Sequence, residues 1–283
     1  MLRVAIIGVS GMLGSTLLRS LSQKENLMLI GTSRRDKLKI HKKINYIHLQ
    51  GMNLESEKDF FEALKLEKPN VIINCAGIIK QKNYSEDHLK TLQINSLFPH
   101  ELNKFCKKEK IRLIQISTDC VFSGAKGNYN EEDISDAKDL YGKSKYLGEI
   151  NDDHALTIRT SIIGHEVNSN HSLLEWFLSQ NDEIEGFTQA IFSGLTTLEL
   201  SEVIYRILKD FTNLCGIYHI SSTPISKYDL LNLVKKIYKK DIKINSSKKI
   251  KIDRSLNSKK FQKKTGIKVS DWETMIKSMK KFG

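Results

Sequence analysis

An apolar run, a cluster of glycines and an amphipathic segment follow one another at the start of the chain. Residues 2–7 (LRVAII) are typical of a short strand buried in a parallel sheet. Gly8, Gly11 and Gly14 then lead into a predicted helix at residues 12–21. Glycines at such a turn let the backbone approach a pyrophosphate, and the helix N-terminus offers it free N–H groups and a positive dipole end. We therefore predict that a dinucleotide cofactor is bound here by Gly8, Gly11, Met12, Leu13 and Gly14.

Strands and helices continue to alternate through the first part of the chain. Further strands are predicted at residues 27–32, 44–49, 71–74, 112–117 and 156–159, and helices at residues 57–66 and 86–107. Because such alternation builds βαβ units, it predicts an α/β fold with a Rossmann-type, doubly wound parallel sheet.

The pattern changes at about residue 164. Helices are predicted at residues 172–179, 198–211, 227–238, 255–264 and 271–281, with short strands at 216–220 and 242–244. We expect a cofactor-binding Rossmann domain at residues 1–163 and a smaller mixed α/β substrate lobe at residues 164–283. No proline- or glycine-rich linker separates the two, so we expect a shared core, with some later elements returning to the first sheet.

Charge narrows the class of partner. The formal net charge is +12, and the lysine excess is concentrated after Lys227. These lysines occupy the polar faces of predicted amphipathic helices with few aromatic residues between them, which favours a solvated surface over a nucleic-acid site. The same positive charge suits the attraction of an anionic small substrate.

Targeting signals and cysteine usage point to the cytoplasm. There is no run of about eighteen apolar residues, so we expect no membrane insertion. The N-terminus lacks the pattern of a signal peptide. The four cysteines, Cys75, Cys106, Cys120 and Cys215, form no CxxC motif. We therefore expect neither a metal site nor a disulfide framework, which fits a reducing cytoplasm.

The segment after the second predicted strand reports on cofactor choice. Ser33, Arg34 and Arg35 stand where an acidic residue would bind the ribose diol of NAD, and arginine suits a 2′-phosphate. NADPH is therefore favoured, while Asp36 leaves NADH as an alternative. Five further cofactor contacts are predicted at strand ends and on a helix: Asn53, Cys75, Ala76, Gly77 and Asn95. Asn95 is interpreted as a buried amide that fixes the backbone or a water chain.

The stretch from residue 114 to residue 149 carries the reactive groups. Tyr141 and Lys145 are four residues apart at the start of a predicted helix, so they share one face. The lysine charge is expected to lower the pKa of the phenol. Thr118 follows the strand at residues 112–117 and can hold a carbonyl beside that phenol. These three residues are the predicted catalytic set, arranged for proton transfer to or from a carbon-bound oxygen.

With these parts in place, the chain resembles the extended branch of the short-chain dehydrogenase/reductase superfamily, and most closely the dTDP-4-dehydrorhamnose reductases. The matching pieces are GVSGMLG, NCAG, Asn95, STDCVFSGAKGNYNEED, YGKSKYLGE and LTIRTSIIG, with weaker similarity in GIYHISS, ISKYDLL and DRSLNSKKF. The resemblance covers essentially the whole chain. It implies NADPH-dependent reduction of a 4-keto-6-deoxy sugar nucleotide for surface polysaccharide or deoxysugar synthesis.

The resemblance also implies roles for single residues. Tyr141 would donate a proton to the C4 oxygen, Lys145 would bind the nicotinamide ribose, and Thr118 would hydrogen-bond the reacting oxygen. Asp119 and Cys120 would border the sugar, and Arg254 would bind the nucleotide diphosphate. Cys120 and Ser123 stand where the rhamnose reductases carry tyrosine and aspartate, so the particular sugar stays open.

Two other readings of the same fold remain. One is an epimerase or 4,6-dehydratase that retains NAD, although Arg34 and the absence of an acid pair after Thr118 speak against it. The other is a non-catalytic subunit that binds NADP, as a regulatory subunit of methionine adenosyltransferase does. The expected partner is a nucleotide sugar, and a homodimer is left open.

Overall fold

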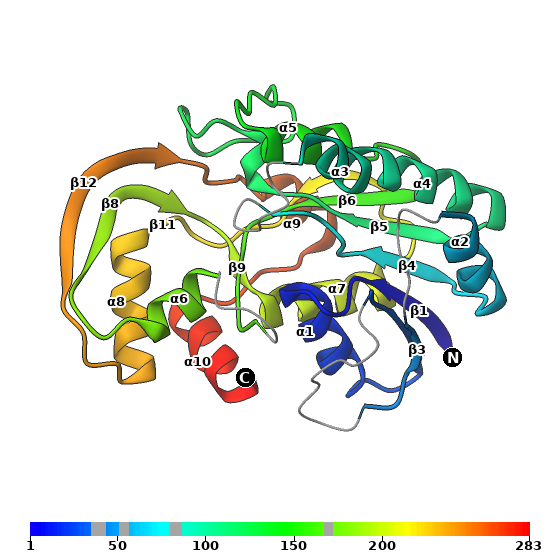
Figure 1. The fold of residues 1–283 in the computed structure, drawn as a ribbon, viewed down its shortest axis with the longest axis horizontal. Helices are drawn as coiled ribbons and strands as arrows, with labels where there is room; N and C mark the ends of the chain where they lie inside the picture. The colour runs from blue at the N-terminus through cyan, green and yellow to red at the C-terminus, as the bar shows by residue number, and fades with distance from the viewer. Residues whose placement is uncertain (35–43, 51–56, 80–86, 167–171) are drawn as a thin grey trace.

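The computed structural model describes residues 1–34, 44–50, 57–79, 87–166 and 172–283. Its centre is a seven-stranded parallel sheet with the order β10-β6-β5-β4-β1-β2-β3 (Figure 1). The strands are β1 (Leu2–Ile7), β2 (Leu27–Thr32), β3 (Ile47–Leu49), β4 (Val71–Asn74), β5 (Arg112–Ile116), β6 (Ala155–Arg159) and β10 (Gly216–His219). This sheet confirms the predicted Rossmann-type α/β fold.

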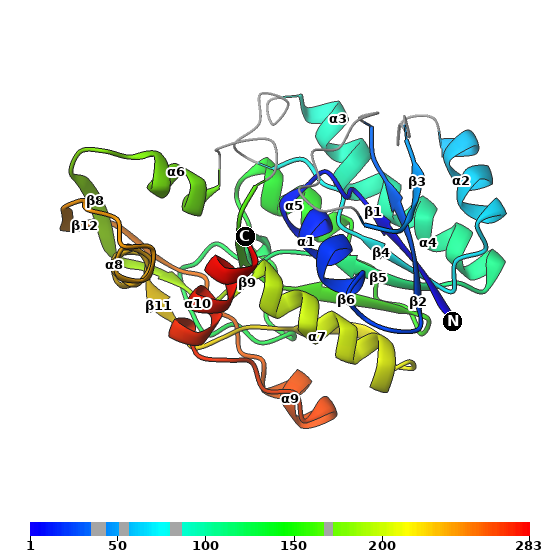
Figure 2. The same cartoon turned by 90° about the horizontal axis from the view of Figure 1, so that it is seen from below.

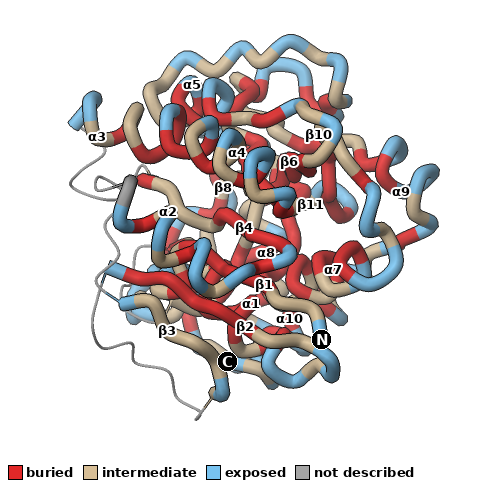
Figure 3. The backbone as a smooth tube through the Cα atoms, turned by 90° about the vertical axis from the view of Figure 1, so that its right-hand side faces the viewer, coloured by how far each residue is buried: buried red, intermediate tan, exposed pale blue. Residues whose placement is uncertain are grey.

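Side chains of β1 point alternately into two apolar cores, one on each face of the sheet. Val4 and Ile6 belong to one core, and Ala5 and Ile7 belong to the other. This double burial explains why the strand is apolar throughout rather than alternating. Figure 3 shows how the buried residues follow the central strands, while exposed residues gather on the outer helices and loops.

Helices cover both faces. On one face lie α1 (Met12–Leu21) and α7 (Thr197–Asp210), which contact each other. The opposite face carries α2 (Glu57–Leu66), α3 (His88–Leu92), α4 (Phe98–Glu109) and α5 (Leu140–Leu147) (Figures 1 and 2). No helix among the described residues has both the length and the apolar character that a bilayer crossing requires.

The predicted helix at residues 86–107 is not continuous. It begins at His88 as α3, passes through a π-helical turn at Gln93–Leu97, and continues as α4 to Glu109. The π turn carries Asn95, whose side chain is buried. Single π turns inside α-helices are frequent at functional sites because they change the direction in which a side chain points.

Residues after 164 build a second sheet in the order β11-β8-β12, beside the carboxyl ends of the central strands (Figure 1). Its strands are β8 (Ile184–Phe192), β11 (Ile225–Ser226) and β12 (Ile244–Asp253). The sequence did not predict β8, and it placed β12 at residues 242–244 only. β12 is an edge strand, and lysines on its exposed residues broke the apolar pattern that strand recognition needs.

The remaining helices are α6 (Leu173–Ser179), α8 (Lys227–Tyr238), α9 (Lys259–Thr265) and α10 (Trp272–Phe282). The helix predicted from residue 255 begins at Lys259 instead. Its first predicted residues pair with a distant loop: Tyr129 donates its N–H to the Ser255 carbonyl (2.8 Å), and Asn257 donates to the Tyr129 carbonyl (2.7 Å). The short strands β7 (Ile162–Ile163) and β9 (Leu195–Thr196) also pair, in parallel.

β10 links the later part of the chain to the first sheet, since residues 216–219 pair in parallel with β6. The division into a domain at residues 1–163 and a lobe at 164–283 remains a prediction.

Candidate active site

The carboxyl end of β5 presents Thr118, Asp119 and Cys120 to the site. A short 3-10 turn at Asp119–Val121 follows the strand, and the Thr118 hydroxyl oxygen accepts a hydrogen bond from the Cys120 N–H at 3.1 Å. Asp119 donates its N–H to the Thr160 carbonyl (3.1 Å), which ties the turn to the end of β6. Thr118 and Asp119 are buried, so their side chains are held in a defined position.

α5 brings Tyr141 to this turn. The helix begins after Asp139, whose carboxylate accepts a hydrogen bond from the Gly142 N–H at 2.9 Å. Gly142 packs so closely on the Cys120 carbonyl that an added Cβ would overlap it. The Tyr141 phenol makes a side-chain hydrogen bond with Thr118, so these two predicted catalytic residues lie side by side.

The π turn supports the same helix from behind. Asn95 accepts a hydrogen bond from the Ile78 N–H (2.8 Å) and donates to the Ile78 carbonyl (3.0 Å) and to the Ser144 hydroxyl (3.1 Å). Ser144 in turn donates to the Tyr141 carbonyl at 2.9 Å. Asn95 is therefore the buried amide that the sequence suggested, and it fixes the backbone on both sides of the site.

Lys145 lies one turn after Tyr141 and is buried. Its ammonium donates to the Ile116 carbonyl at 2.7 Å. Burial lowers the pKa of Lys145 to about 8, while the charges of Glu149 and Cys75 act in the opposite direction. An added Cβ on Gly77 would lie 3.9 Å from this ammonium, so Gly77 keeps open the space in front of the lysine.

The pKa of Tyr141 does not follow the expectation from the sequence. Burial raises it above the ordinary value, and Cys120 and Asp119 push in the same direction, while a hydrogen bond with Thr118 lowers it. The expected lowering by the lysine was wrong for the protein alone, because desolvation outweighs the attraction of a charge directed at Ile116.

The glycine turn, Gly8 to Gly14, joins β1 to α1 beside the end of β4. Gly8 has a φ of +84°, and an added Cβ would lie 3.3 Å from the Ala76 Cα. A Cβ on Gly14 would overlap the Gly8 carbonyl. Gly11 caps α1 without a side-chain hydrogen bond, which leaves first-turn N–H groups for a phosphate. This turn fits a dinucleotide, and a side chain at Gly8 or Gly14 would press on neighbouring backbone.

The end of β2 reaches the glycine turn, since Gly8 and Val9 donate their N–H groups to the Thr32 carbonyl at 3.2 and 3.1 Å. Ser33 is buried and its hydroxyl lies 2.8 Å from His48 Nε2, whereas Arg34 is exposed. Of the other predicted cofactor residues, Cys75 and Ala76 directly follow β4. Asn53, Arg35 and Asp36 lie outside the described residues.

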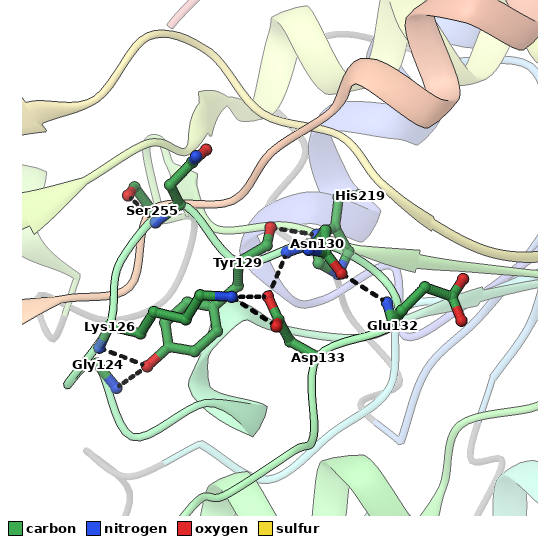
Figure 4. Close-up of polar contacts among 9 residues, drawn as sticks. Gly124, Lys126, Tyr129, Asn130, Glu132, Asp133, His219 and Ser255 are labelled. Atoms are coloured by element: carbon green, nitrogen blue, oxygen red, sulfur yellow. Dashed lines mark hydrogen bonds and ion pairs between the residues drawn. The ribbon is translucent and has the colours of Figure 1, made fainter.

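Arg254 reaches the site from the loop after β12. Its Nε donates to the Phe122 carbonyl (2.8 Å) and its Nη1 lies 3.5 Å from the Cys120 Sγ. The loop that contains Gly124, Lys126 and Tyr129 is held by hydrogen bonds of its own (Figure 4). Tyr129 Oη accepts hydrogen bonds from the N–H groups of Gly124 and Lys126 at 3.2 and 3.0 Å. Arg254, predicted to bind the nucleotide diphosphate, thus lies beside Cys120, which was predicted to border the sugar.

A buried polar network lies below the reactive residues and was not predicted. Glu149 accepts a hydrogen bond from the Ser117 hydroxyl (2.6 Å). It also forms a bidentate ion pair with Arg159, at 2.8 and 2.7 Å. The Arg159 Nη1 lies 3.4 Å from His219, whose Nδ1 lies 3.0 Å from the Tyr129 carbonyl. Glu149 is the last residue of YGKSKYLGE, and Arg159 lies within LTIRTSIIG. These two charged residues were the features of the sequence from which the network could have been predicted.

Lys227 also lies near Asp119 and Cys120 and was not among the predicted site residues. It is the first residue of α8, and its ammonium lies 3.9 Å from the centroid of the buried Phe192 ring. The signal available in the sequence was a lysine directly after the helix-capping Ser226, within ISKYDLL.

Comparison with known proteins gives one family over nearly the whole chain. The family model described as "RmlD substrate binding domain" matches residues 2–282. The chain is 25% identical to a dTDP-4-dehydrorhamnose reductase of Aggregatibacter actinomycetemcomitans, covering 100% of this chain and 99% of the relative. It is 26% identical to the spore coat polysaccharide biosynthesis protein SpsK of Bacillus subtilis, over 81% of this chain and 76% of the relative.

A solved structure agrees in fold. The dTDP-4-dehydrorhamnose reductase of Bacillus anthracis, solved in complex with NADP, superposes with a TM-score of 0.82. The alignment covers 99% of this chain and 98% of that one at 20% identity, so this likeness concerns the fold.

Proposed function

The chain belongs to the RmlD substrate binding domain family, and on this premise we propose that it is an NADPH-dependent reductase of a 4-keto-6-deoxy sugar nucleotide. The observation that carries the proposal is the meeting of Thr118 and Tyr141, with Lys145 one turn further along α5. The relatives described as a dTDP-4-dehydrorhamnose reductase and as a polysaccharide biosynthesis protein support a role in deoxysugar or surface polysaccharide synthesis.

The reaction needs a proton on the carbonyl oxygen that the reduction turns into a hydroxyl. Tyr141 holds this proton, because burial raises its pKa and keeps the phenol protonated. Thr118 orients the carbonyl oxygen toward the phenol. Lys145, charged below pH about 8, binds the nicotinamide ribose and compensates the charge that develops on Tyr141 as the proton leaves.

The cofactor supplies the hydride when it is bound. Gly8, Gly11 and Gly14 hold its pyrophosphate, with Met12 and Leu13 at the first helical turn of α1. Arg34 selects the 2′-phosphate of NADPH, with Ser33 beside it. The choice agrees with the NADP complex of the Bacillus anthracis reductase. Asn53, Cys75, Ala76, Gly77 and Asn95 complete the proposed cofactor site.

On the substrate side, Asp119 and Cys120 border the sugar and Arg254 binds the nucleotide diphosphate. Cys120 and Ser123 leave the particular sugar open, and the nucleotide base is open as well. We place the protein in the cytoplasm, in keeping with its biosynthetic relatives. Whether it forms a homodimer is answered by measuring its mass in solution.

The test is NADPH oxidation with a panel of 4-keto-6-deoxy sugar nucleotides. Tyr141→Phe removes the proton donor, so turnover falls by about 10² to 10⁴-fold while NADPH binding is retained. Tyr146→Phe, an exposed position on the same helix, is the matched control and leaves turnover unchanged.

Other outcomes contradict the proposal. A wild-type protein that binds NADPH but oxidises none across the panel is not this reductase. Purification with stoichiometric NAD(H) would indicate an epimerase or dehydratase that retains NAD. A stable complex with a synthetase, unaffected by Tyr141→Phe, would indicate a non-catalytic subunit.

A further inference from the structure

Lys227 stands at the junction of the two sheets. It begins α8, and the preceding Ser226 caps that helix by accepting a hydrogen bond from the Asp229 N–H at 3.0 Å. The Lys227 ammonium lies over the Phe192 ring of β8, 3.9 Å from its centroid, in a cation–π contact. The start of this lysine's helix and the ring beneath it are therefore both fixed.

The ammonium end of Lys227 is enclosed although the side chain as a whole is only partly buried. Burial lowers the pKa of Lys227 to about 8, and the nearby Asp119 and Cys120 act against this fall. Within the described residues, no carboxylate lies within ion-pair distance of the ammonium, and no hydrogen-bond acceptor meets it. A lysine that is desolvated without a partner is costly to the fold, which is a reason to look for a ligand.

Arg254 is the second cation whose charge acts on Asp119. It uses Nε on the Phe122 carbonyl and Nη1 on the Cys120 sulfur, and no ion pair with a described carboxylate uses its charge. Gly124, at a φ of +86°, lies against the Arg254 side chain, where an added Cβ would come within 3.0 Å of Cγ. Arg254 is thus anchored through neutral partners and keeps its charge for something else.

Asp119 can neutralise at most one of these two cations. Burial raises the pKa of Asp119, and Arg254 and Lys227 are the charges that oppose the rise. Two cations, which we call the cation pair (Lys227 and Arg254), therefore share one buried carboxyl group whose desolvation favours the neutral form. The local balance is positive, and this part of the site is matched to an anion.

The cation pair lies close to the reacting group. Asp119 and Cys120 influence the pKa of Lys227, and both also raise the pKa of Tyr141. Lys227 therefore faces the same short turn as the phenol, from β8 and α8 rather than from the central sheet.

We propose that Lys227 determines substrate specificity by binding, together with Arg254, an anionic oxygen group of the substrate next to the sugar that Tyr141 protonates. The inference rests on the proposed function and names the chemistry of one part of that site. The anionic group has two sources, the phosphate attached to the anomeric carbon or a carboxylate on the sugar ring. Both present oxygen acceptors to an ammonium and a guanidinium.

Other lysines of α8 show what a surface lysine looks like in this protein. Lys236 is exposed and lies 3.9 Å from Glu273, in a shallow groove between α8 and α10 that is also lined by Lys277, Lys280 and Lys281. Lys236 and Lys277 both have Glu273 as an acidic partner at the surface. Lys236 is therefore the matched control for Lys227 on the same helix.

The experiment measures binding without turnover, in the presence of saturating NADP⁺. Wild type, Lys227→Met, Lys227→Arg and Lys236→Met are titrated calorimetrically with thymidine, dTDP, UDP, UDP-glucose and UDP-glucuronate. The methionine keeps the contact with Phe192 and removes the charge. If the phosphate is the source, Lys227→Met weakens dTDP and UDP by roughly ten- to hundredfold. Thymidine binding stays unchanged, Lys227→Arg retains most of the affinity, and Lys236→Met behaves as wild type.

If a sugar carboxylate is the source, Lys227→Met leaves dTDP and UDP unchanged and abolishes a preference of the wild type for UDP-glucuronate over UDP-glucose. The inference is overturned if Lys227→Met binds every probe as wild type does, or if wild type binds none of the anionic probes. A melting curve for each variant separates lost binding from lost folding. A protein that shows the Lys227 effect but fails to oxidise NADPH would refute the proposed function and leave this inference standing.

Discussion

The cofactor side and the substrate side of the proposed site bind negative charge by different means. On the cofactor side, the glycine turn offers backbone N–H groups at the start of α1, and the glycines at positions 8 and 14 are packed too closely for any side chain. On the substrate side, Lys227 and Arg254 offer charged side chains from α8 and from the loop after β12. One side is built from local backbone, and the other from residues that are distant in sequence.

This difference separates what each side can vary. Backbone N–H groups bind any pyrophosphate of the right shape. They can do so only where the chain approaches it closely, so the glycines that permit this approach tolerate little change. A side-chain site changes its preference with a single substitution, such as one at Lys227. We expect a substitution at Lys227 to change substrate preference, and a substitution in the glycine turn to weaken the binding of any dinucleotide.

The largest effect is expected from breaking the buried ion pair between Glu149 and Arg159. Glu149 and Arg159 are almost fully buried, and they connect Ser117, at the end of β5, to His219 and the loop under Arg254. Arg159→Met leaves a buried carboxylate without its partner, so the free energy of unfolding falls by about 3–5 kcal/mol. Chemical denaturation monitored by circular dichroism measures it.

The matched control is Lys249→Met, which breaks an exposed ion pair with Glu185 (2.6 Å) on β12 and β8. No measurable loss is expected there, because solvent screens the pair. An Arg159→Met protein as stable as this control would mean that the two sides do not depend on the buried network.

A smaller effect is expected from a methyl group in the glycine turn. Gly14→Ala places a Cβ against the Gly8 carbonyl, so α1 must shift and NADPH affinity falls by roughly ten- to hundredfold. Ser22→Ala, at the carboxyl end of the same helix and away from the glycine turn, is the control and leaves NADPH affinity unchanged. Fluorescence titration with NADPH decides the matter. Equal affinities for the two variants would contradict the close packing described for Gly14.

The smallest effect is a difference in pH dependence. Lys145 and Lys227 both have a pKa of about 8 through burial, so each ammonium is charged below that pH and neutral above it. Glu149 and Cys75 face Lys145, and Asp119 and Cys120 face Lys227. In the wild type, affinity for NADPH and for dTDP should each fall up to about tenfold per unit as pH rises above 8.

Lys227→Met separates the two sides in this experiment. It should remove the pH dependence of dTDP binding and leave that of NADPH binding in place, as measured by titrations at several pH values. If both dependences persist in Lys227→Met, the charge on the substrate side belongs to another group.

The sequence predicted the features that are carried by close neighbours along the chain. The strand, glycine turn and helix at the N-terminus are contiguous, and Tyr141 and Lys145 are one helical turn apart. The Rossmann-type sheet and the family resemblance, which rested on such motifs, are both confirmed. The roles of the site residues remain predictions.

What the sequence did not predict depends on contacts between distant segments. β8 (IEGFTQAIF) mixes glycine and polar residues, and it is a strand because it pairs with β11 and β12 on either side. Lys227 becomes a site residue only because Phe192 and Asp119 lie beside it. The direction of the Tyr141 pKa likewise follows from burial, which no local spacing reports.

The place of β10 in the central sheet has a consequence for synthesis of the chain. β10 is contributed by residues 216–219, and it covers the edge of β6, at residues 155–159. During translation, β6 leaves the ribosome well before its neighbour exists, so its edge stays open until the later segment emerges. A fragment ending near residue 163 would keep that edge permanently, and we expect it to aggregate rather than fold as a free-standing cofactor-binding protein.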